Sequence, residues 1–296
     1  MRDHLDPLKP GRKGMVLFGL AGSGKTQLAL KFVQVFGNRY SAIIWINASS
    51  SPQLSQSLTE AADFIKASLW PSKDHPNTYY GKETAKIVTP RLRSTVHNRW
   101  LLVIDSVDDI ESTDFRNLIP ECKHGSTIIT STRRTAAELF EAVGFSSRDI
   151  DSLDDLSATQ LLLASSSPLV GASNQNFAAY HEEPGKIARE LYGIPLALEQ
   201  AGALIRKRIV SLESFVERYR THYKALMAKR PARGATSYEK GHSVLSVMSL
   251  LFLSIQNESP ESAHLLVVLT VLSLRKIPLS LLKETYVAVT VGQTGN

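Results

Sequence analysis

The segment Gly19–Thr26 constrains the fold more than any other, because it reads GLAGSGKT and matches the pattern G-x-x-x-x-G-K-[ST] in full. A short apolar run over residues 14–19 leads into it, and apolar residues recur at helical spacing between residues 28 and 36. A buried strand, a glycine turn and an amphipathic helix in this order are the opening of an α/β sheet. Glycines let main-chain N–H groups surround a phosphate, and the N-terminus of the following helix adds a favourable potential. The pattern therefore predicts a phosphate-binding loop rather than a plain glycine turn.

Two residues of this loop have predicted roles toward a nucleotide. Lys25 is expected to reach the β- and γ-phosphates, and the hydroxyl of Thr26 is expected to ligate Mg²⁺. Such a loop needs an acidic partner at the end of another strand, and Asp105 directly follows the apolar run Leu101–Ile104. Asp105 is predicted to hold Mg²⁺ through water. Taken alone, the same run would describe a strand capped by a solvated acidic turn.

Two further charged residues follow strand-like runs. Asp108 lies in the loop after Asp105. Arg133 follows the run at residues 126–130 and is a candidate sensor of a γ-phosphate, because its planar guanidinium can bind two oxygens at once. An ordinary surface arginine is the alternative for Arg133. We take Asp105, Asp108 and Arg133 as the predicted catalytic residues.

The chain divides into an α/β half and an all-helical half. Further strand-like runs lie at residues 42–46, 100–104 and 126–130, with a short fifth candidate at 148–153. Within this half, helices are expected at 52–69 and 83–98, and an exposed loop at 71–82. After residue 153 only helices are expected, at 156–166, 176–192, 195–208, 211–228, 243–257 and 260–273. The predicted fold class is α/β with a parallel sheet, followed by an all-α region.

Composition and charge narrow the function. Of the 296 residues 43% are hydrophobic and one is cysteine, so a sizeable core is expected, and an internal disulfide or a cysteine-rich zinc site is excluded. The N-terminus shows no secretory apolar region, which favours a cytoplasmic location. The apolar run at 265–274 is shorter than the roughly 18–20 residues of a membrane span, so it predicts a buried helix and no membrane association.

The net charge of +6 is local to residues 206–240, which carry ten Lys or Arg and three Glu, so nucleic acid is not an expected partner.

Several motifs in a fixed order resemble those of the NB-ARC domain, the nucleotide-binding switch of STAND-class P-loop NTPases in NLR-type receptors, and most of all its fungal branch. They span residues 14–285 and read FGLAGSGKT, AIIWINAS, WLLVIDSVDD, GSTIITSTRR, LDDLSATQLL, YGIPLALEQAGALI and SVMSLLFLSIQNESPESAHLLVVLTVLSLRKIPLSLL. The ordered set, above all Gly193–Ala197, is more specific than the loop alone. The resemblance implies a P-loop α/β domain over 1–153, an ARC1-like helical subdomain over 154–230 and an ARC2-like partial winged helix over 231–296.

The resemblance also implies a function. It predicts an ADP/ATP-binding signalling switch with Mg²⁺, in which the nucleotide controls the arrangement of the subdomains, with protein partners or self-association in the active state. Pro195, which opens a helix after Gly193, is expected to lie over the nucleotide. The nucleotide-binding residues expected on this basis are Gly19, Leu20, Ala21, Gly22, Ser23, Gly24, Lys25, Thr26, Gln27, Arg133 and Pro195, and the metal ligands are Thr26 and Asp105.

Three departures from the family pattern modify these expectations. Family members usually carry an hhGRE segment that embraces the adenine, whereas here 18 residues precede Gly19 and residues 11–13 are too close to the loop to serve. Ser106 stands where a second acidic residue often follows Asp105, so hydrolysis is expected to be slow or absent. The sequence ends before a His-Asp motif of the winged helix, and a fragment or shortened product is expected.

Two other functions stay open. One is a DNA-associated initiator or regulatory ATPase of the same superfamily that uses the basic segment 206–240, and salt-dependent retention on DNA would distinguish it. The other is a small-molecule kinase, for which the loop 71–82 is the candidate lid, and a phosphorylated acceptor would distinguish it.

Overall fold

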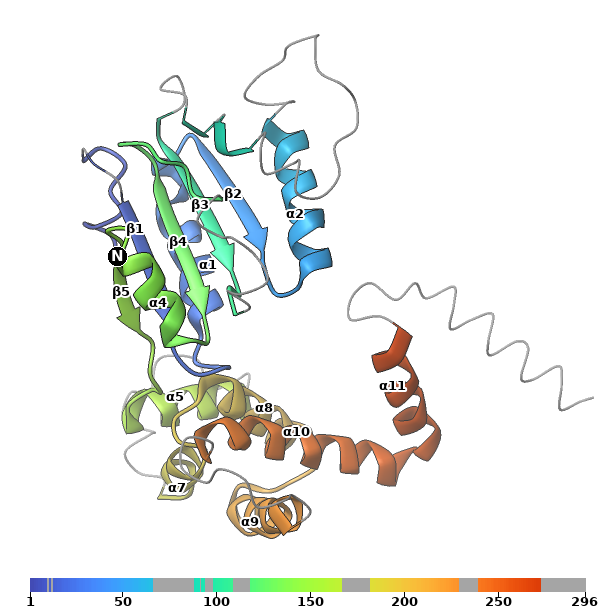
Figure 1. The fold of residues 1–296 in the computed structure, drawn as a ribbon. Helices are drawn as coiled ribbons and strands as arrows, with labels where there is room; N and C mark the ends of the chain where they lie inside the picture. The colour runs from blue at the N-terminus through green and yellow to red at the C-terminus, as the bar shows by residue number, and fades with distance from the viewer. Residues whose placement is uncertain are drawn as a thin grey trace, which may run out of the picture.

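The structure, a computed structural model, describes residues 1–9, 11, 13–65, 88–90, 92–93, 98–108, 118–166, 182–228 and 239–272. It consists of a parallel sheet flanked by helices, followed by a helical region beside the carboxyl ends of the strands (Figure 1). The predicted fold class is confirmed. The predicted loop at 71–82 lies outside the described residues, and so does most of the helix expected at 83–98, of which residues 88–90 are helical.

The sheet contains five parallel strands in the order β2-β3-β4-β1-β5. Their bounds are β1 Lys13–Phe18, β2 Ala42–Asn47, β3 Trp100–Asp105, β4 Ser126–Ser131 and β5 Ser146–Asp149. Every residue of β1 and β4 is buried, as expected for the central strands of a parallel sheet covered on both faces. Because β4 lies between β1 and β3, residues at its carboxyl end lie between the glycine loop and Asp105.

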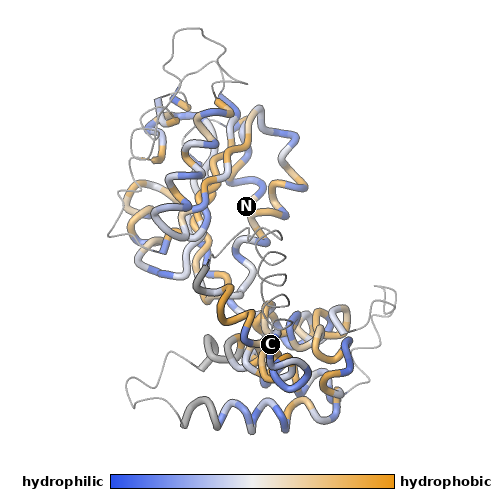
Figure 2. Tube along the Cα trace, turned by 90° about the vertical axis from the view of Figure 1, so that its right-hand side faces the viewer, coloured by the Kyte–Doolittle hydropathy of each residue, from blue (hydrophilic) through white to orange (hydrophobic). Residues whose placement is uncertain are grey.

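Successive side chains of the strands enter two different cores. Met15 and Leu17 of β1 pack with Phe32 of helix α1 on one face. Val16 packs on the other face in the cluster that contains Leu58 of α2 and Phe140 of α4. The bounds of the elements around the sheet are α1 Lys25–Phe36, the 3₁₀ turn η1 Gly37–Arg39, α2 Ser51–Phe64 and α4 Arg134–Glu141. Figure 2 shows the resulting concentration of hydrophobic residues along the strands.

The helical region has its own core. Its elements are α5 Asp155–Ser166, α7 Glu182–Glu190, α8 Pro195–Arg206, α9 Leu212–Ala228, α10 Glu239–Glu258 and α11 Pro260–Leu272. Fully buried Leu162, Leu198 and Phe215 bring α5, α8 and α9 into one hydrophobic cluster, which Val247 of α10 also joins. Helices were predicted for all six of these segments. Among the residues that the structure describes, no helix is long and apolar enough to cross a bilayer.

Two predictions at the edges of these regions are wrong in detail. The fifth strand spans Ser146–Asp149 instead of 148–153, because it pairs with β1 from Met15 onward through polar residues. The apolar residues 150 and 153, which suggested a later strand, instead lead into the helical region. The helix predicted for the apolar run at 265–274 forms as α11 but is not buried, since Leu265, Leu266, Val267 and Val268 are 40–53% exposed. It packs against α10 and extends away from the core of the helical region (Figure 1).

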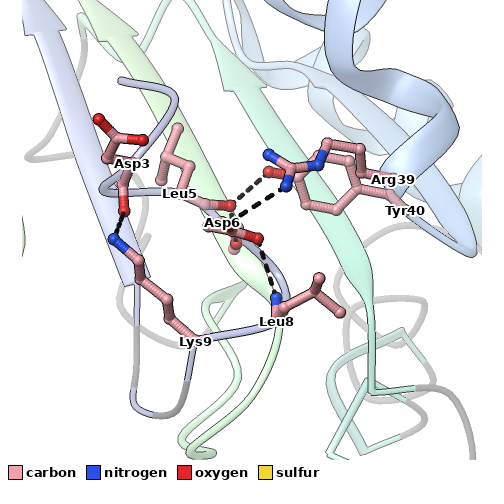
Figure 3. Close-up of polar contacts among 8 residues, drawn as sticks. Asp3, Leu5, Asp6, Leu8, Lys9, Arg39 and Tyr40 are labelled. Carbon is pink, nitrogen blue, oxygen red and sulfur yellow. Dashed lines mark hydrogen bonds and ion pairs between the residues drawn. The ribbon is translucent and has the colours of Figure 1, made fainter.

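The N-terminal segment closes the amino end of the sheet (Figure 3). The side chain of Leu5 is fully buried among residues of the α1-side core. Its carbonyl accepts hydrogen bonds from the hydroxyl of Tyr40 at 2.5 Å and that of Ser126 at 3.1 Å. Burial raises the pKa of the Tyr40 phenol to about 12. A 3.3 Å ion pair between Arg39 and Asp6 holds the same segment.

We expect Leu5→Ala to lower the free energy of unfolding by about 2 kcal/mol, because it removes a fully buried side chain from the core. Chemical denaturation measures this change. Leu8→Ala is the matched control, since Leu8 lies three residues away and is 70% exposed, so its loss should change stability by less than about 0.5 kcal/mol. Equal effects of the two substitutions would show that the N-terminal segment contributes no packing energy.

Candidate functional site

The glycine loop joins the carboxyl end of β1 to the first turn of α1. Gly19, Gly22 and Gly24 have φ values of +138°, +82° and +94°, a region that residues with a Cβ rarely adopt. Gly24 caps α1, and its carbonyl accepts a hydrogen bond from the N–H of Leu28 at 2.8 Å. The loop is therefore a compact turn directly above a helix N-terminus, as the pattern predicted.

Lys25 lies across this loop. Its ammonium donates hydrogen bonds to the carbonyls of Gly19 at 2.9 Å and Leu20 at 2.6 Å. The residue is only 8% exposed, and burial lowers its pKa, although the nearby carboxylates of Asp108 and Asp105 partly offset this effect. A desolvated ammonium held by main-chain carbonyls is suited to binding an anion at the loop, because an anion would stabilise its charged form.

Ser23 supplies a second indication of an anion site. Its side-chain oxygen is buried and has no hydrogen-bond partner among the described residues. A buried hydroxyl without a partner is energetically unfavourable, and a ligand oxygen would satisfy it. Of the other predicted loop residues, Ala21 and Gln27 are exposed and Leu20 is half-buried, so these three line the open side of the turn.

Thr26 and Asp105 meet between the loop and β3. The Thr26 hydroxyl donates to Oδ1 of Asp105 at 2.7 Å, and the hydroxyl of Thr130 donates to the same oxygen at 2.6 Å. Thr130 Oγ1 also accepts a hydrogen bond from the N–H of Ser106 at 2.8 Å. The hydroxyl and the carboxylate that were predicted to share a Mg²⁺ ion are thus adjacent, and the end of β4 fixes the carboxylate.

Asp108 is fixed by the residues that follow β4. Its Oδ1 accepts hydrogen bonds from the N–H of Thr132 at 2.6 Å and the hydroxyl of Ser131 at 3.1 Å. Ser106, two residues earlier, has a φ of +65°, which turns the chain sharply after β3. The carboxylate of Asp108 also raises the pKa of Lys25, against the larger lowering by burial.

Arg133 is the N-cap residue of α4, and its main-chain N–H donates to Ser131 Oγ at 3.0 Å. Its side chain is exposed. The neighbouring Arg134 has a structural role instead, because its guanidinium lies 5.6 Å from the centre of the Phe18 ring and forms a 3.4 Å ion pair with Glu138. Both arginine side chains are exposed, and Phe18 and Glu138 are the contacts of Arg134.

The turn before α8 contacts the loop. Pro195 is the first residue of α8, and the N–H of Leu196 donates to the carbonyl of Gly22 at 3.2 Å. Gly193 has a φ of +63°, and its carbonyl accepts a hydrogen bond from the N–H of Leu153 at 2.9 Å. The proline expected near the nucleotide is thus next to the glycine loop, although the two segments are far apart in the sequence.

Residues 1–9 lie at the opposite end of the sheet from the loop. His4 Nε2 is 3.0 Å from the carbonyl of Gly14, and Leu5 contacts the first residue of β4. This segment therefore lies at the amino ends of the strands, whereas Lys25 follows the carboxyl end of β1. Among the described residues, no group of three or more His, Cys, Asp or Glu side chains could hold a metal ion. A metal at Thr26 and Asp105 would take its remaining ligands from phosphate and water, as Mg²⁺ commonly does.

The structure adds site residues that the sequence analysis did not identify. Thr130 and Ser131 orient the two carboxylates, and Ile194 and Leu196 approach the loop from the helical region. Thr130 and Ser131 could have been recognised from the sequence, because they are two polar residues at the end of a predicted strand. The contact of Leu196 with Gly22 had no local signal, because it depends on the packing of two distant segments.

Residues 13–164 match the family described as NACHT domain. A nucleotide-binding leucine-rich repeat (NLR)-like protein of Hyaloscypha variabilis is 23% identical over 291 residues, which cover 90% of this chain and 28% of that protein. Disease resistance protein Pik-1 of Oryza sativa subsp. japonica is 28% identical over 200 residues, which cover 63% of this chain and 17% of that protein. The predicted resemblance to NLR-type STAND NTPases is confirmed. The chain spans less than a third of the length of these relatives.

Solved structures with a similar arrangement are more distant. Cdc6p from Pyrobaculum aerophilum has a TM-score of 0.44 and 15% identity, covering 77% of this chain and 59% of that chain. PCH-2 of C. elegans has a TM-score of 0.38 and 15% identity, covering 80% of this chain and 62% of that chain.

Proposed function

The chain belongs to the NACHT family, and from this premise we propose that it is an NLR-type signalling switch that binds ADP and ATP with Mg²⁺. One observation carries the proposal: Lys25, Thr26 and Asp105 converge at a glycine loop that also contacts α8 of the helical region. A site with this construction can bind a phosphate chain and, at the same time, sense its presence through a second part of the molecule.

We assign the ligand contacts as follows. The main-chain N–H groups of Gly19–Thr26 and the Lys25 ammonium hold the phosphates, with Ser23 Oγ as a further donor. Thr26 and Asp105 hold Mg²⁺, which neutralises part of the phosphate charge. Thr130 keeps the Asp105 carboxylate aligned through its 2.6 Å hydrogen bond.

The nucleotide can bias the arrangement of the protein only if ATP and ADP contact one arrangement differently. Arg133 is the residue that we assign to this difference. Its side chain is exposed at the start of α4, directly after the strand end that carries Thr130 and Ser131. A guanidinium in this position can bind a γ-phosphate that ADP lacks.

Hydrolysis is proposed to be slow or absent. Ser106 has no acidic group with which to activate water, and its N–H is used to hold Thr130. Asp108 is the carboxylate that we assign as the candidate base. Two hydrogen bonds from Ser131 and Thr132 keep it in place beside the loop. In the active state we propose self-association or protein partners, in keeping with the NLR-like relatives.

We expect Arg133→Ala to weaken ATP binding about tenfold while leaving ADP binding nearly unchanged, because a charged hydrogen bond to the γ-phosphate is worth about 1.5 kcal/mol. Calorimetric titration of each nucleotide with Mg²⁺ measures both affinities. Arg134→Ala is the matched control and should not alter the ratio of the two affinities, since that side chain contacts Phe18 and Glu138. An unchanged ratio in the Arg133 variant would refute the discriminating role.

A further inference from the structure

The three positions of the loop that hold glycine do so for different structural reasons. A Cβ on Gly24 would meet no atom within 4 Å, so only its φ requires glycine. A Cβ on Gly19 would collide with the carbonyl of Ile150, which follows β5. Gly22 alone faces α8: a Cβ there would lie 3.0 Å from Cβ of Leu196 and 3.4 Å from Cγ2 of Ile194. Gly22 is also the glycine that the phosphate-binding pattern does not specify.

The α8 side of this contact is firmly held within the helical region. Ile194 is 1% exposed and belongs to the core cluster of that region. Gly193 is tied on both sides, because its N–H donates to the carbonyl of Ala188 in α7 at 3.0 Å and its carbonyl accepts from the N–H of Leu153. Because the turn before α8 is held in this way, we expect a displacement of Gly22 to move α7 and α8 as well.

The hydrogen bond from Leu196 to Gly22 also stabilises the first turn of α8. Leu196 lies in the first turn of α8, where main-chain N–H groups have no partner within the helix. The Gly22 carbonyl satisfies this donor at 3.2 Å, so the loop acts as part of the cap of α8. A loop that rearranges around phosphate will strengthen or weaken this cap, and the stability of the first turn of α8 will change with it.

We propose that Gly22 is the positioning residue that couples phosphate binding at the loop to α8, through its carbonyl and through the close approach of Leu196. The inference rests on the proposed nucleotide binding and adds to it a specific route to the helical region. It predicts that ADP changes the protection of the first turn of α8, residues 195–199, and that this response depends on Leu196.

The test is hydrogen–deuterium exchange of the full chain with and without ADP and Mg²⁺, alongside calorimetric measurement of ADP affinity. In the parent chain we expect ADP to slow exchange in the first turn of α8 about tenfold, within the usual range of coupling between sites. Leu196→Pro removes the N–H that donates to the Gly22 carbonyl, at a first-turn position where a helix tolerates proline. This variant should still bind ADP, with affinity reduced by less than about tenfold, but its α8 response should fall below about twofold. Leu196 is 36% exposed, so this substitution should leave the fold intact.

Leu156→Pro is the matched control, because Leu156 is a 56% exposed leucine at the same position in the first turn of α5, and it should keep the full response. A residue with only a structural role would change exchange equally with and without ADP. A full ADP response in Leu196→Pro, or no α8 response in a parent chain that binds ADP, overturns the coupling but leaves nucleotide binding intact. Failure of the parent chain to bind ADP overturns both proposals.

Discussion

Lys25→Ala is expected to abolish ADP binding, with a loss of about 3 kcal/mol or more, which corresponds to more than about a hundredfold in Kd. The Lys25 ammonium donates hydrogen bonds to two carbonyls of the loop, and the residue is 8% exposed. A charge in such a desolvated place interacts with phosphate more strongly than a surface lysine could. The main-chain amides of the loop remain in the variant, but without the cation they face two or three phosphate charges alone.

The substitution should not unfold the protein. It removes two hydrogen bonds to main-chain carbonyls, but it also removes a buried ammonium whose pKa is lowered by desolvation, and these effects oppose each other. Native mass spectrometry should detect ADP that copurifies with the parent chain and none with the variant, and calorimetry should give the change in Kd. Lys31→Ala, an exposed lysine on the same helix, is the control and should bind ADP like the parent. Unchanged ADP affinity in Lys25→Ala would refute the proposed phosphate site.

The elements that the sequence predicted well are those whose burial is complete. β1 and β3 are covered on both faces and contain the continuous apolar runs Met15–Phe18 and Trp100–Ile104. β4 is buried as well and is marked by its β-branched residues Thr127–Thr130. β5 lies at the edge of the sheet, reads Ser-Ser-Arg-Asp and is partly exposed, so no apolar signal marked its position. Helix α4 was not predicted, although Ala136, Ala137 and Phe140 recur at helical spacing and face the sheet. The segment is short, and its polar residues hid this pattern.

The candidate site likewise contains residues that the sequence could predict and contacts that it could not. The glycine loop and Asp105 were recognisable because each directly follows an apolar run that predicts a strand. The link between Gly22 and Leu196 depends on how α5, α7 and α8 pack and on where that core meets the sheet. No local pattern contains this information. The exposure of α11 was missed for a related reason, because an apolar run predicts a helix but not the element that covers it.

Asp105→Asn is expected to remove the Mg²⁺ dependence of ATP binding. An asparagine Oδ1 can accept the same hydrogen bonds from Thr26 and Thr130 that the carboxylate accepts at 2.7 and 2.6 Å, so the shape of the site should be kept and only its charge lost. Mg²⁺ binds through one or two carboxylates together with phosphates, and here Asp105 is the carboxylate that contacts Thr26. We expect Mg²⁺ to tighten ATP binding about tenfold in the parent chain and less than about twofold in the variant.

The same substitution should have the opposite effect on nucleotide without metal. In the absence of Mg²⁺ the Asp105 carboxylate repels phosphate, so the neutral asparagine should bind metal-free ADP at least as tightly as the parent does. Calorimetric titrations in EDTA and in Mg²⁺ separate these two effects. Asp149→Asn is the control: this exposed carboxylate also acts on Lys25 electrostatically but is the last residue of β5 rather than of β3, so the variant should keep the Mg²⁺ enhancement. Weaker binding of metal-free ADP by Asp105→Asn would mean that the carboxylate supports the loop itself rather than a metal ion, and the assignment of Mg²⁺ to Thr26 and Asp105 would have to be abandoned.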